Sequence, residues 1–119
     1  MVENWLLLLE RNLAIEGVGL VGATGSFESL RPEYSDFPNF PNCHLRSTGF
    51  LIRRQLFGEF AHKLQISTKE AAFRFESGPQ SLTRFVLSKA LEVLVVGRNG
   101  RGYSPRWWPQ SECFRQGAQ

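Results

Sequence analysis

The sequence predicts an α+β domain that is mainly α-helical and carries a small β-hairpin. Apolar residues recur at helical spacing in three segments between residues 47 and 94, and the dipeptide Asn99-Gly100 follows them. Asn-Gly is the strongest short-range signal for a two-residue hairpin turn, because both central positions need positive φ. A chain of 119 residues is long enough for one core and too short for two. We therefore expect a single domain over residues 1–119, with residues 109–119 as a tail.

The charge of the chain is divided unevenly along its length. Residues 1–46 hold three basic and six acidic side chains, a net charge of −3, whereas residues 47–119 hold eleven and five, a net charge of +6. This asymmetry indicates an anionic partner for the C-terminal part, although a basic solvated surface would show the same pattern. Cys43 and Cys113 lack a CxxC spacing, which is typical of reduced thiols. Cys43-His44 supplies only two metal ligands, so no metal site is expected.

The first sixteen residues are expected to form an amphipathic helix, because apolar residues recur there at helical intervals. These residues are Trp5, Leu6, Leu9 and Leu13. Leu7 and Leu8 widen the apolar stripe, so the helix either packs into the core or is shared with another chain. The apolar run is far shorter than the roughly 20 residues that span a bilayer, and the pattern of a signal peptide is lacking. A cytoplasmic location without membrane contact is therefore expected.

The glycine-rich stretch GVGLVGATG, residues 17–25, contains the pattern GxGxxG. A dinucleotide site would also need a helix directly after the glycines. The segment that follows carries Pro32, Pro38 and Pro41, so no crossover helix can form there. We interpret the stretch as a turn or a short glycine-rich strand, and we expect no cofactor.

Residues 26–46 are predicted to form an extended arm, because each proline favours extended backbone before it. Four aromatic side chains are expected to fasten the arm across the core, since a loop of this length is either tied down or functional. They are Phe27, Tyr34, Phe37 and Phe40. An exposed arm that binds a partner protein is the alternative.

Three helices are predicted after the arm. The first begins at Ser47 or Thr48 and extends to residue 64, with apolar residues at a period of 3.6. The second covers residues 68–76 behind Ser67, because a glutamate three residues later completes a capping box. The third covers residues 81–94 and is apolar on one side only. The polar side of this third helix is therefore available for binding.

A basic hairpin is predicted after the third helix. A two-residue turn at 99–100 would place Arg98 opposite Arg101 and Val96 opposite Tyr103. Like charges directly opposite each other destabilise a hairpin. A phosphate between the two guanidinium groups would turn this repulsion into attraction. The alternative is that both side chains point away from each other into solvent.

Helix, short helix, glycine turn, helix and basic hairpin follow one another in residues 47–108. This order resembles a winged helix-turn-helix DNA-binding domain. The resemblance implies a winged-helix-like core of three helices, to which the N-terminal helix and the aromatic arm are added. It further implies that helix 81–94 enters the major groove and that residues 95–108 form a wing that touches the neighbouring backbone or minor groove.

By this resemblance the protein would be a small transcriptional regulator that binds double-stranded DNA. The wing arginines would supply salt-sensitive contacts to phosphate, and the fork of Arg84 is suited to pair with guanine. The residues expected to contact nucleic acid are Ser81, Arg84, Ser88, Lys89, Arg98, Arg101 and Arg106.

The alternative function is a non-catalytic interaction or structural subunit of a larger assembly. Such a subunit would dock through apolar residues of the first helix and the arm, which would also serve a homodimer. The residues expected at that interface are Trp5, Leu8, Leu9, Phe37 and Phe40. An enzyme is not expected, because spacing alone assembles no nucleophile-base pair, carboxylate pair or metal constellation.

Overall fold

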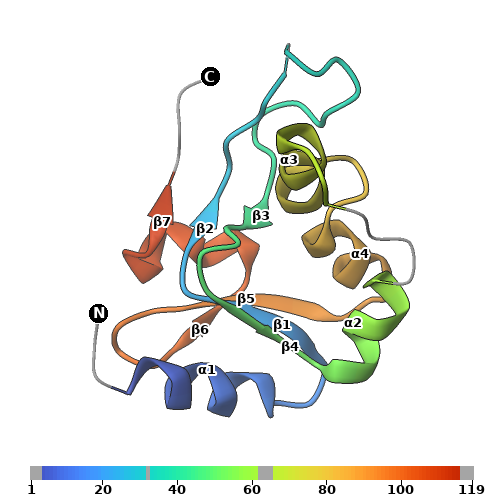
Figure 1. The fold of residues 1–119 in the computed structure, drawn as a ribbon. Coiled ribbons are helices and arrows are strands. Elements are labelled where there is room, and N and C mark those ends of the chain that lie inside the picture. Colours follow the sequence, from blue (N-terminus) through green and yellow to red (C-terminus); the bar gives the residue numbers. More distant parts are fainter. Residues whose placement is uncertain (1–3, 32, 62–65, 116–119) are drawn as a thin grey trace.

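Two small β-sheets form the centre of the molecule, and helices lie around them (Figure 1). The computed structural model describes residues 4–31, 33–61 and 66–115. Within these ranges the helices are α1 (Trp5–Leu13), α2 (Arg54–Ala61), α3 (Lys69–Ser77), α4 (Leu82–Ser88) and the 3₁₀ helix η1 (Pro105–Ser111). The strands are β1 (Val18–Gly22), β2 (Gly25–Ser26), β3 (His44–Leu45), β4 (Phe50–Ile52), β5 (Glu92–Val96), β6 (Gly102–Tyr103) and β7 (Phe114–Arg115). The α+β class is therefore confirmed, but the β-structure is more extensive than one hairpin.

The larger sheet has the strand order β4-β1-β5-β6, and its two inner strands, β1 and β5, are parallel. β4 pairs antiparallel with β1, and β6 pairs antiparallel with β5. Every residue of β1 and the last four residues of β5 are buried. Strands that are covered on both faces have nearly continuous apolar sequences, as VGLVG and VLVV do here.

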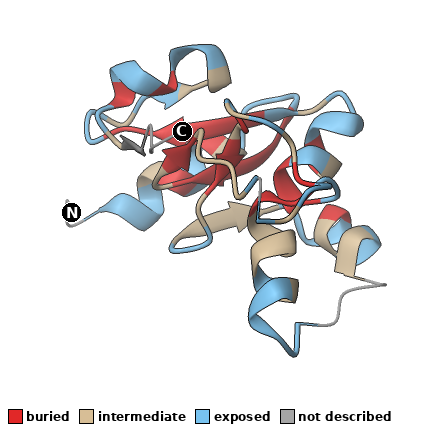
Figure 2. Ribbon diagram, turned by 90° about the horizontal axis from the view of Figure 1, so that it is seen from above, coloured by how far each residue is buried: buried red, intermediate tan, exposed pale blue. Residues whose placement is uncertain are grey.

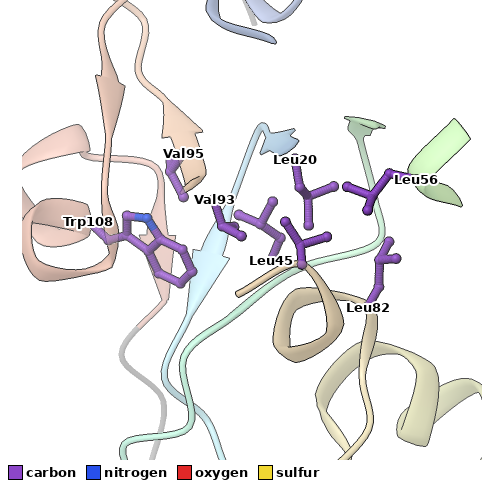
Figure 3. Packing of buried hydrophobic residues seen from close by; sticks show 8 residues of the cluster. Leu20, Leu45, Leu56, Leu82, Val93, Val95 and Trp108 are labelled. Atoms are coloured by element: carbon purple, nitrogen blue, oxygen red, sulfur yellow. The ribbon is translucent and has the colours of Figure 1, made fainter. Parts of the chain in front are cut away.

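Helices cover both faces of this sheet, and each face carries its own apolar cluster. On one face, Leu9 of α1 packs with Leu94 and Val96 of β5. On the other face, Val93 and Val95 pack with side chains from α2, α4 and η1 (Figure 3). Successive side chains of a strand point to opposite faces, so β5 serves both clusters. Figure 2 shows the buried residues gathered in these inner strands, with the exposed residues mainly on the outer helices and loops.

The smaller sheet has the order β3-β2-β7, with β2 antiparallel to β3 and parallel to β7. Trp108 of η1 is fully buried and lies directly against Gly25 of β2. A Cβ atom on Gly25 would lie 2.6 Å from the indole ring, so this close approach requires glycine. The stretch of residues 17–25 thus contains glycine-rich strand, which confirms one of the two interpretations of its sequence.

The predicted helix over residues 81–94 is wrong beyond Ser88. The helix ends there because Ala90 has a φ of 60°, which is a left-handed conformation. Glycine is the usual sequence signal for such a helix end, and this position holds alanine instead. The run that follows forms β5, since three valines suit a strand that is covered on both faces. Periodicity alone does not separate a short apolar strand from a buried helical turn.

The helix predicted from Ser47 or Thr48 begins later than expected. Phe50–Ile52 forms β4 along the buried strand β1, and α2 begins at Arg54. Tertiary pairing therefore outweighs the helical spacing of the apolar residues in this segment. The last three residues predicted for this helix, 62–64, lie outside the described residues.

The other two helix starts are confirmed within one residue. The hydroxyl of Thr68 accepts a hydrogen bond of 3.0 Å from the backbone N of Ala71, so Thr68 caps α3 in place of Ser67. Ser81 caps α4 in the same way, and its hydroxyl accepts from the backbone N of Arg84 at 3.3 Å.

The basic hairpin is present, but its turn differs from the prediction. Residues 98–100 form a three-residue loop, so Val96 pairs with Gly102 and not with Tyr103. Within the loop only Gly100 has a positive φ, of 83°, whereas the two-residue turn needs two such residues. Three-residue loops with a left-handed glycine are a common alternative in hairpins.

The aromatic arm is fastened across the molecule, as expected. Phe37 is 1% exposed and stacks on Tyr34 with ring centroids 5.0 Å apart. The buried amide of Asn42 donates a hydrogen bond of 2.7 Å to the carbonyl of Ser77, at the end of α3. Phe37 is therefore part of the packed interior and not available to a partner protein.

A winged-helix core is not confirmed by this architecture. β5 is an inner strand of a sheet that the N-terminal half completes with β1, whereas the resemblance placed residues 47–108 as a self-contained unit. The helices α2 and α4 cover a face of that sheet, with α3 beyond them (Figure 1).

Replacing Gly25 by alanine is expected to destabilise the fold by about 1–3 kcal/mol, because the added methyl overlaps Trp108 and Val95. Gly58 is the matched control, because a Cβ atom there meets nothing within 4 Å. The Gly58→Ala variant is expected to stabilise α2 by about 1 kcal/mol. Urea unfolding of both variants measures the difference, and equal stability of Gly25→Ala and the parent chain would contradict the packing described.

Candidate functional site

The residues predicted to contact DNA from the third helix differ in their availability. Arg84, Ser88 and Lys89 are exposed on or next to α4. Ser81 is only 1% exposed, and its hydroxyl is used as the helix cap. Ser81 is therefore a structural residue, and three of the four predicted positions remain on the surface.

The three predicted wing arginines lie away from α4. Arg98, Arg101 and Arg106 are all exposed, and the guanidinium of Arg106 lies 5.2 Å from the ring centre of Trp107. Strand β5 runs from the end of α4 to the hairpin, so its length separates the two groups (Figure 1). Arg98 lies in the turn and not opposite Arg101, which corrects the expected repulsive pair. The structure thus does not bring the helix residues and the hairpin residues together.

A pocket of about 340 Å³ opens where the parallel strands β1 and β5 end. Ala23 and Thr24 follow β1, and Gly97 and Arg98 follow β5. The carboxyl ends of parallel strands meet at one edge of a sheet, and in open α/β sheets ligands bind at that edge. We call this cavity the strand-end pocket. Its lining residues are Trp5, Leu8, Leu9, Ala23, Thr24, Val96, Gly97, Arg98, Glu112 and Cys113.

One wall of the strand-end pocket is apolar and comes from α1. Trp5, Leu8 and Leu9 form it, and all three were predicted at a partner interface. Leu9 is buried and Trp5 is 37% exposed, so the wall extends from the core to the surface. Phe40, the remaining surface candidate for that interface, is half-buried in the arm and does not line the pocket.

The polar side of the strand-end pocket carries one cation and one carboxylate. Arg98 and Glu112 are both exposed, and within the described part of the chain neither forms an ion pair. Glu112 has a φ of 62°, a strained conformation for a side chain of this kind. This conformation ends η1, because Glu112 is the residue that caps the C-terminus of that helix. The two charges are therefore free to meet a ligand.

No family model, curated protein or solved structure matches this chain. Only the geometry and chemistry of the sites therefore bear on the ligand.

Among the residues that the structure describes, no group of three or more His, Cys, Asp or Glu side chains could hold a metal ion. In the same residues, no helix is long and apolar enough to cross a membrane.

Sequence reasoning missed Thr24, Glu112 and Cys113 as pocket residues. Thr24 lies within the glycine-rich stretch of residues 17–25, which the prolines downstream had excluded as a dinucleotide site. The other two follow η1, in a segment interpreted as part of the tail. Nothing in the local sequence marks the left-handed conformation of Glu112, because neither glycine nor asparagine stands there.

A buried histidine lies in β3, outside the strand-end pocket. The Nδ1 atom of His44 donates a hydrogen bond of 2.7 Å to the carbonyl of Asn42, and the residue is 4% exposed. Burial lowers the pKa of His44 below its ordinary value, against the opposing effects of that hydrogen bond and of Glu76. Burial also raises the pKa of the neighbouring Cys43 thiol, which favours its protonated form.

The buried His44 is expected to make the stability of the protein depend on pH. Its folded-state pKa lies below its unfolded-state value of about 6.5, so the unfolded chain binds the additional proton. The stability that this histidine provides is therefore present above about pH 6.5 and is lost as the pH falls through the folded-state pKa. A His44→Asn variant retains a donor for the Asn42 carbonyl and cannot titrate.

Urea unfolding at a series of pH values from about 7.5 to about 5 measures this effect. The parent chain should lose more stability over that range than His44→Asn. The pKa of Asp36 is also lowered, by a hydrogen bond from Arg74, but its effect on stability falls at lower pH, outside this range. If the unfolding free energies of the two proteins change with pH in parallel, the titration of buried His44 does not contribute to stability.

Proposed function

We propose that the protein is a non-catalytic binding module that holds a small zwitterionic ligand of the amino-acid class in the strand-end pocket. The observation that carries this proposal is the pair Arg98 and Glu112, two opposite charges without ion-pair partners among the described residues, on one pocket with an apolar wall. The sequence offered a non-catalytic interaction or structural subunit of a larger assembly as its alternative. A module that binds a small molecule shares only the absence of catalysis with that subunit.

Three properties of the pocket support this ligand class. The planar guanidinium of Arg98 matches a carboxylate through two parallel hydrogen bonds. The carboxylate of Glu112 accepts hydrogen bonds from an ammonium group. Leu8 and Trp5 offer an apolar surface for a side chain, and about 340 Å³ lies at the lower end of small-molecule pockets. A zwitterion can pair its carboxylate with Arg98 and its ammonium with Glu112. A ligand with a single charge can pair with only one of these two residues and leaves the other without a partner.

Leucine is the probe that tests this proposal, with isocaproate and isoamylamine as analogues that lack its ammonium or its carboxylate. Binding to the folded state raises stability, by about 2.7 kcal/mol at a ligand concentration of 100 times Kd. Thermal unfolding with each compound and titration calorimetry measure the effect. Leucine should bind and stabilise, and each analogue should bind about tenfold more weakly because one ion pair is lost.

Variants assign this binding to the strand-end pocket. Arg98→Gln and Glu112→Gln should each weaken leucine binding about tenfold. Arg101→Gln is the matched control, because Arg101 lies in the same hairpin but does not line the pocket. Equal binding of leucine by Arg98→Gln and by the parent chain would refute the proposal, as would equal binding of leucine and isocaproate.

Binding of double-stranded DNA through the hairpin remains the second candidate. It is favoured by Arg98, Arg101 and Arg106, none of which forms an ion pair in the part of the chain that the structure describes. Trp107, under the guanidinium of Arg106, is 50% exposed and adds an aromatic surface beside these charges. The α4 residues do not share this surface, so the hairpin would bind alone.

Fluorescence anisotropy with a random duplex at several salt concentrations tests this second candidate. Three phosphate contacts predict a slope of log K against log salt of about −2.7. An Arg101→Gln/Arg106→Gln double variant should bring the slope close to about −0.9 and leave leucine binding unchanged. A slope near zero for the parent chain would exclude DNA binding by the hairpin. This result would not affect the proposal for the strand-end pocket, which the leucine experiments test.

A further inference from the structure

A second and larger cavity lies between α2, α3 and α4, on a different part of the molecule from the strand-end pocket. Its volume is about 800 Å³, and side chains from all three helices line it. We call it the helical groove. The residues that line it are Asp36, Glu59, Phe60, Ala71, Arg74, Phe75, Pro79, Gln80, Arg84, Phe85 and Ser88.

The apolar part of the helical groove is aromatic. Phe60 of α2 contacts Phe75 of α3 with ring centroids 5.8 Å apart in an edge-on arrangement. It also contacts Phe85 of α4 at 5.3 Å. All three rings are only partly buried, so part of their surface faces the groove. Such a cluster favours a flat aromatic ligand, because rings add to one another edge to face or in offset stacks.

Most charges at the rim of the helical groove already have partners. Arg74 donates to Asp36 at 2.7 Å and to Glu70 at 2.9 Å, and these bonds lower the pKa of Asp36 and raise that of Arg74. Lys89 lies 3.3 Å from Glu59. These contacts neutralise the rim locally, so a highly charged ligand would find few free cations there.

Arg84 is the exception at the rim. It is exposed on α4, lines the groove, and forms no ion pair within residues 4–31, 33–61 and 66–115. Ser88, one helical turn further along, also lines the groove, and its hydroxyl donates to the carbonyl of Phe85, which leaves the hydroxyl oxygen as an acceptor. The groove therefore presents one free positive charge next to an aromatic surface.

We propose that the helical groove binds a small planar aromatic monoanion, whose ring lies on the phenylalanine cluster and whose charged group pairs with Arg84. One free guanidinium balances one negative charge, so a carboxylate or sulfonate on an aromatic body fits better than a polyanion. The volume of about 800 Å³ lies within the range of small-molecule pockets. This site is independent of the strand-end pocket and does not rest on the function proposed for it.

Anilinonaphthalene sulfonate and its neutral counterpart, N-phenylnaphthylamine, test the proposal by fluorescence titration of the full chain. The two probes share their aromatic body and differ in the sulfonate. The parent chain should bind the sulfonate about tenfold more tightly than the neutral probe, and Arg84→Gln should remove this difference. Arg54→Gln, at the exposed start of α2 and outside the groove lining, is the matched control and should retain it.

Two further variants locate the bound probe. Ser88→Trp fills the groove from an exposed helix end and keeps Arg84, so it should weaken binding of both probes. Arg98→Gln removes the free cation of the strand-end pocket and should leave sulfonate binding unchanged. The proposal is overturned if Arg84→Gln retains the preference for the sulfonate, if Ser88→Trp binds as the parent chain does, or if Arg98→Gln alone removes binding.

Discussion

The parallel pairing of β1 with β5 is the interaction on which the rest of the structure depends. The paired residues, Val18 with Glu92 through Gly22 with Val95, are far apart in the sequence, so their pairing closes a long loop at an entropic cost. Burial of both strands on both faces offsets that cost, because each face gains an apolar cluster. Once the pair has formed, α1 must cover one face and α2 and α4 the other. The same pairing brings the segments after the two strands to one edge, where the strand-end pocket opens.

The proposed functions follow from charged side chains that form no ion pair within the described part of the chain. Arg74 and Lys89 pair with nearby carboxylates, whereas Arg84 and Arg98 line cavities and form no ion pair in the described ranges. Exposed ion pairs contribute little to stability, so a missing partner costs the fold little. A hydrated arginine beside an apolar wall instead offers a ligand both a charge and a surface to cover. Each cavity combines these two features. Among the described residues that line the two cavities, only Glu112 of the strand-end pocket is a carboxylate without an ion-pair partner.

Sequence patterns predicted local features well where the cause is local. Ser81 caps a helix because its hydroxyl reaches a backbone N–H three residues ahead, and the aromatic arm is fastened through Phe37, one of the two arrangements that its sequence allowed. Patterns failed where a distant segment decided the outcome. Residues 93–94 and the apolar run of residues 50–52 carry helical spacing, yet both segments form strands because β1 was available to pair with them. The hairpin was foreseen, but its register was set by a loop with only one left-handed residue.

By itself, the sequence determined that the chain combines helices with β-structure, where α3 and α4 begin, and which arginines lie on the surface. These properties depend on residues within a few positions of one another, such as a cap and its amide or a turn and its glycine. Only the tertiary structure decided which exposed charges share a cavity. Arg98 and Glu112 line the same pocket because a parallel strand pair and η1 bring their loops together, and α4 carries Arg84 away from the hairpin by the length of β5. Such arrangements join segments that are far apart in the chain, and no local sequence pattern encodes how close two such segments lie in the folded structure.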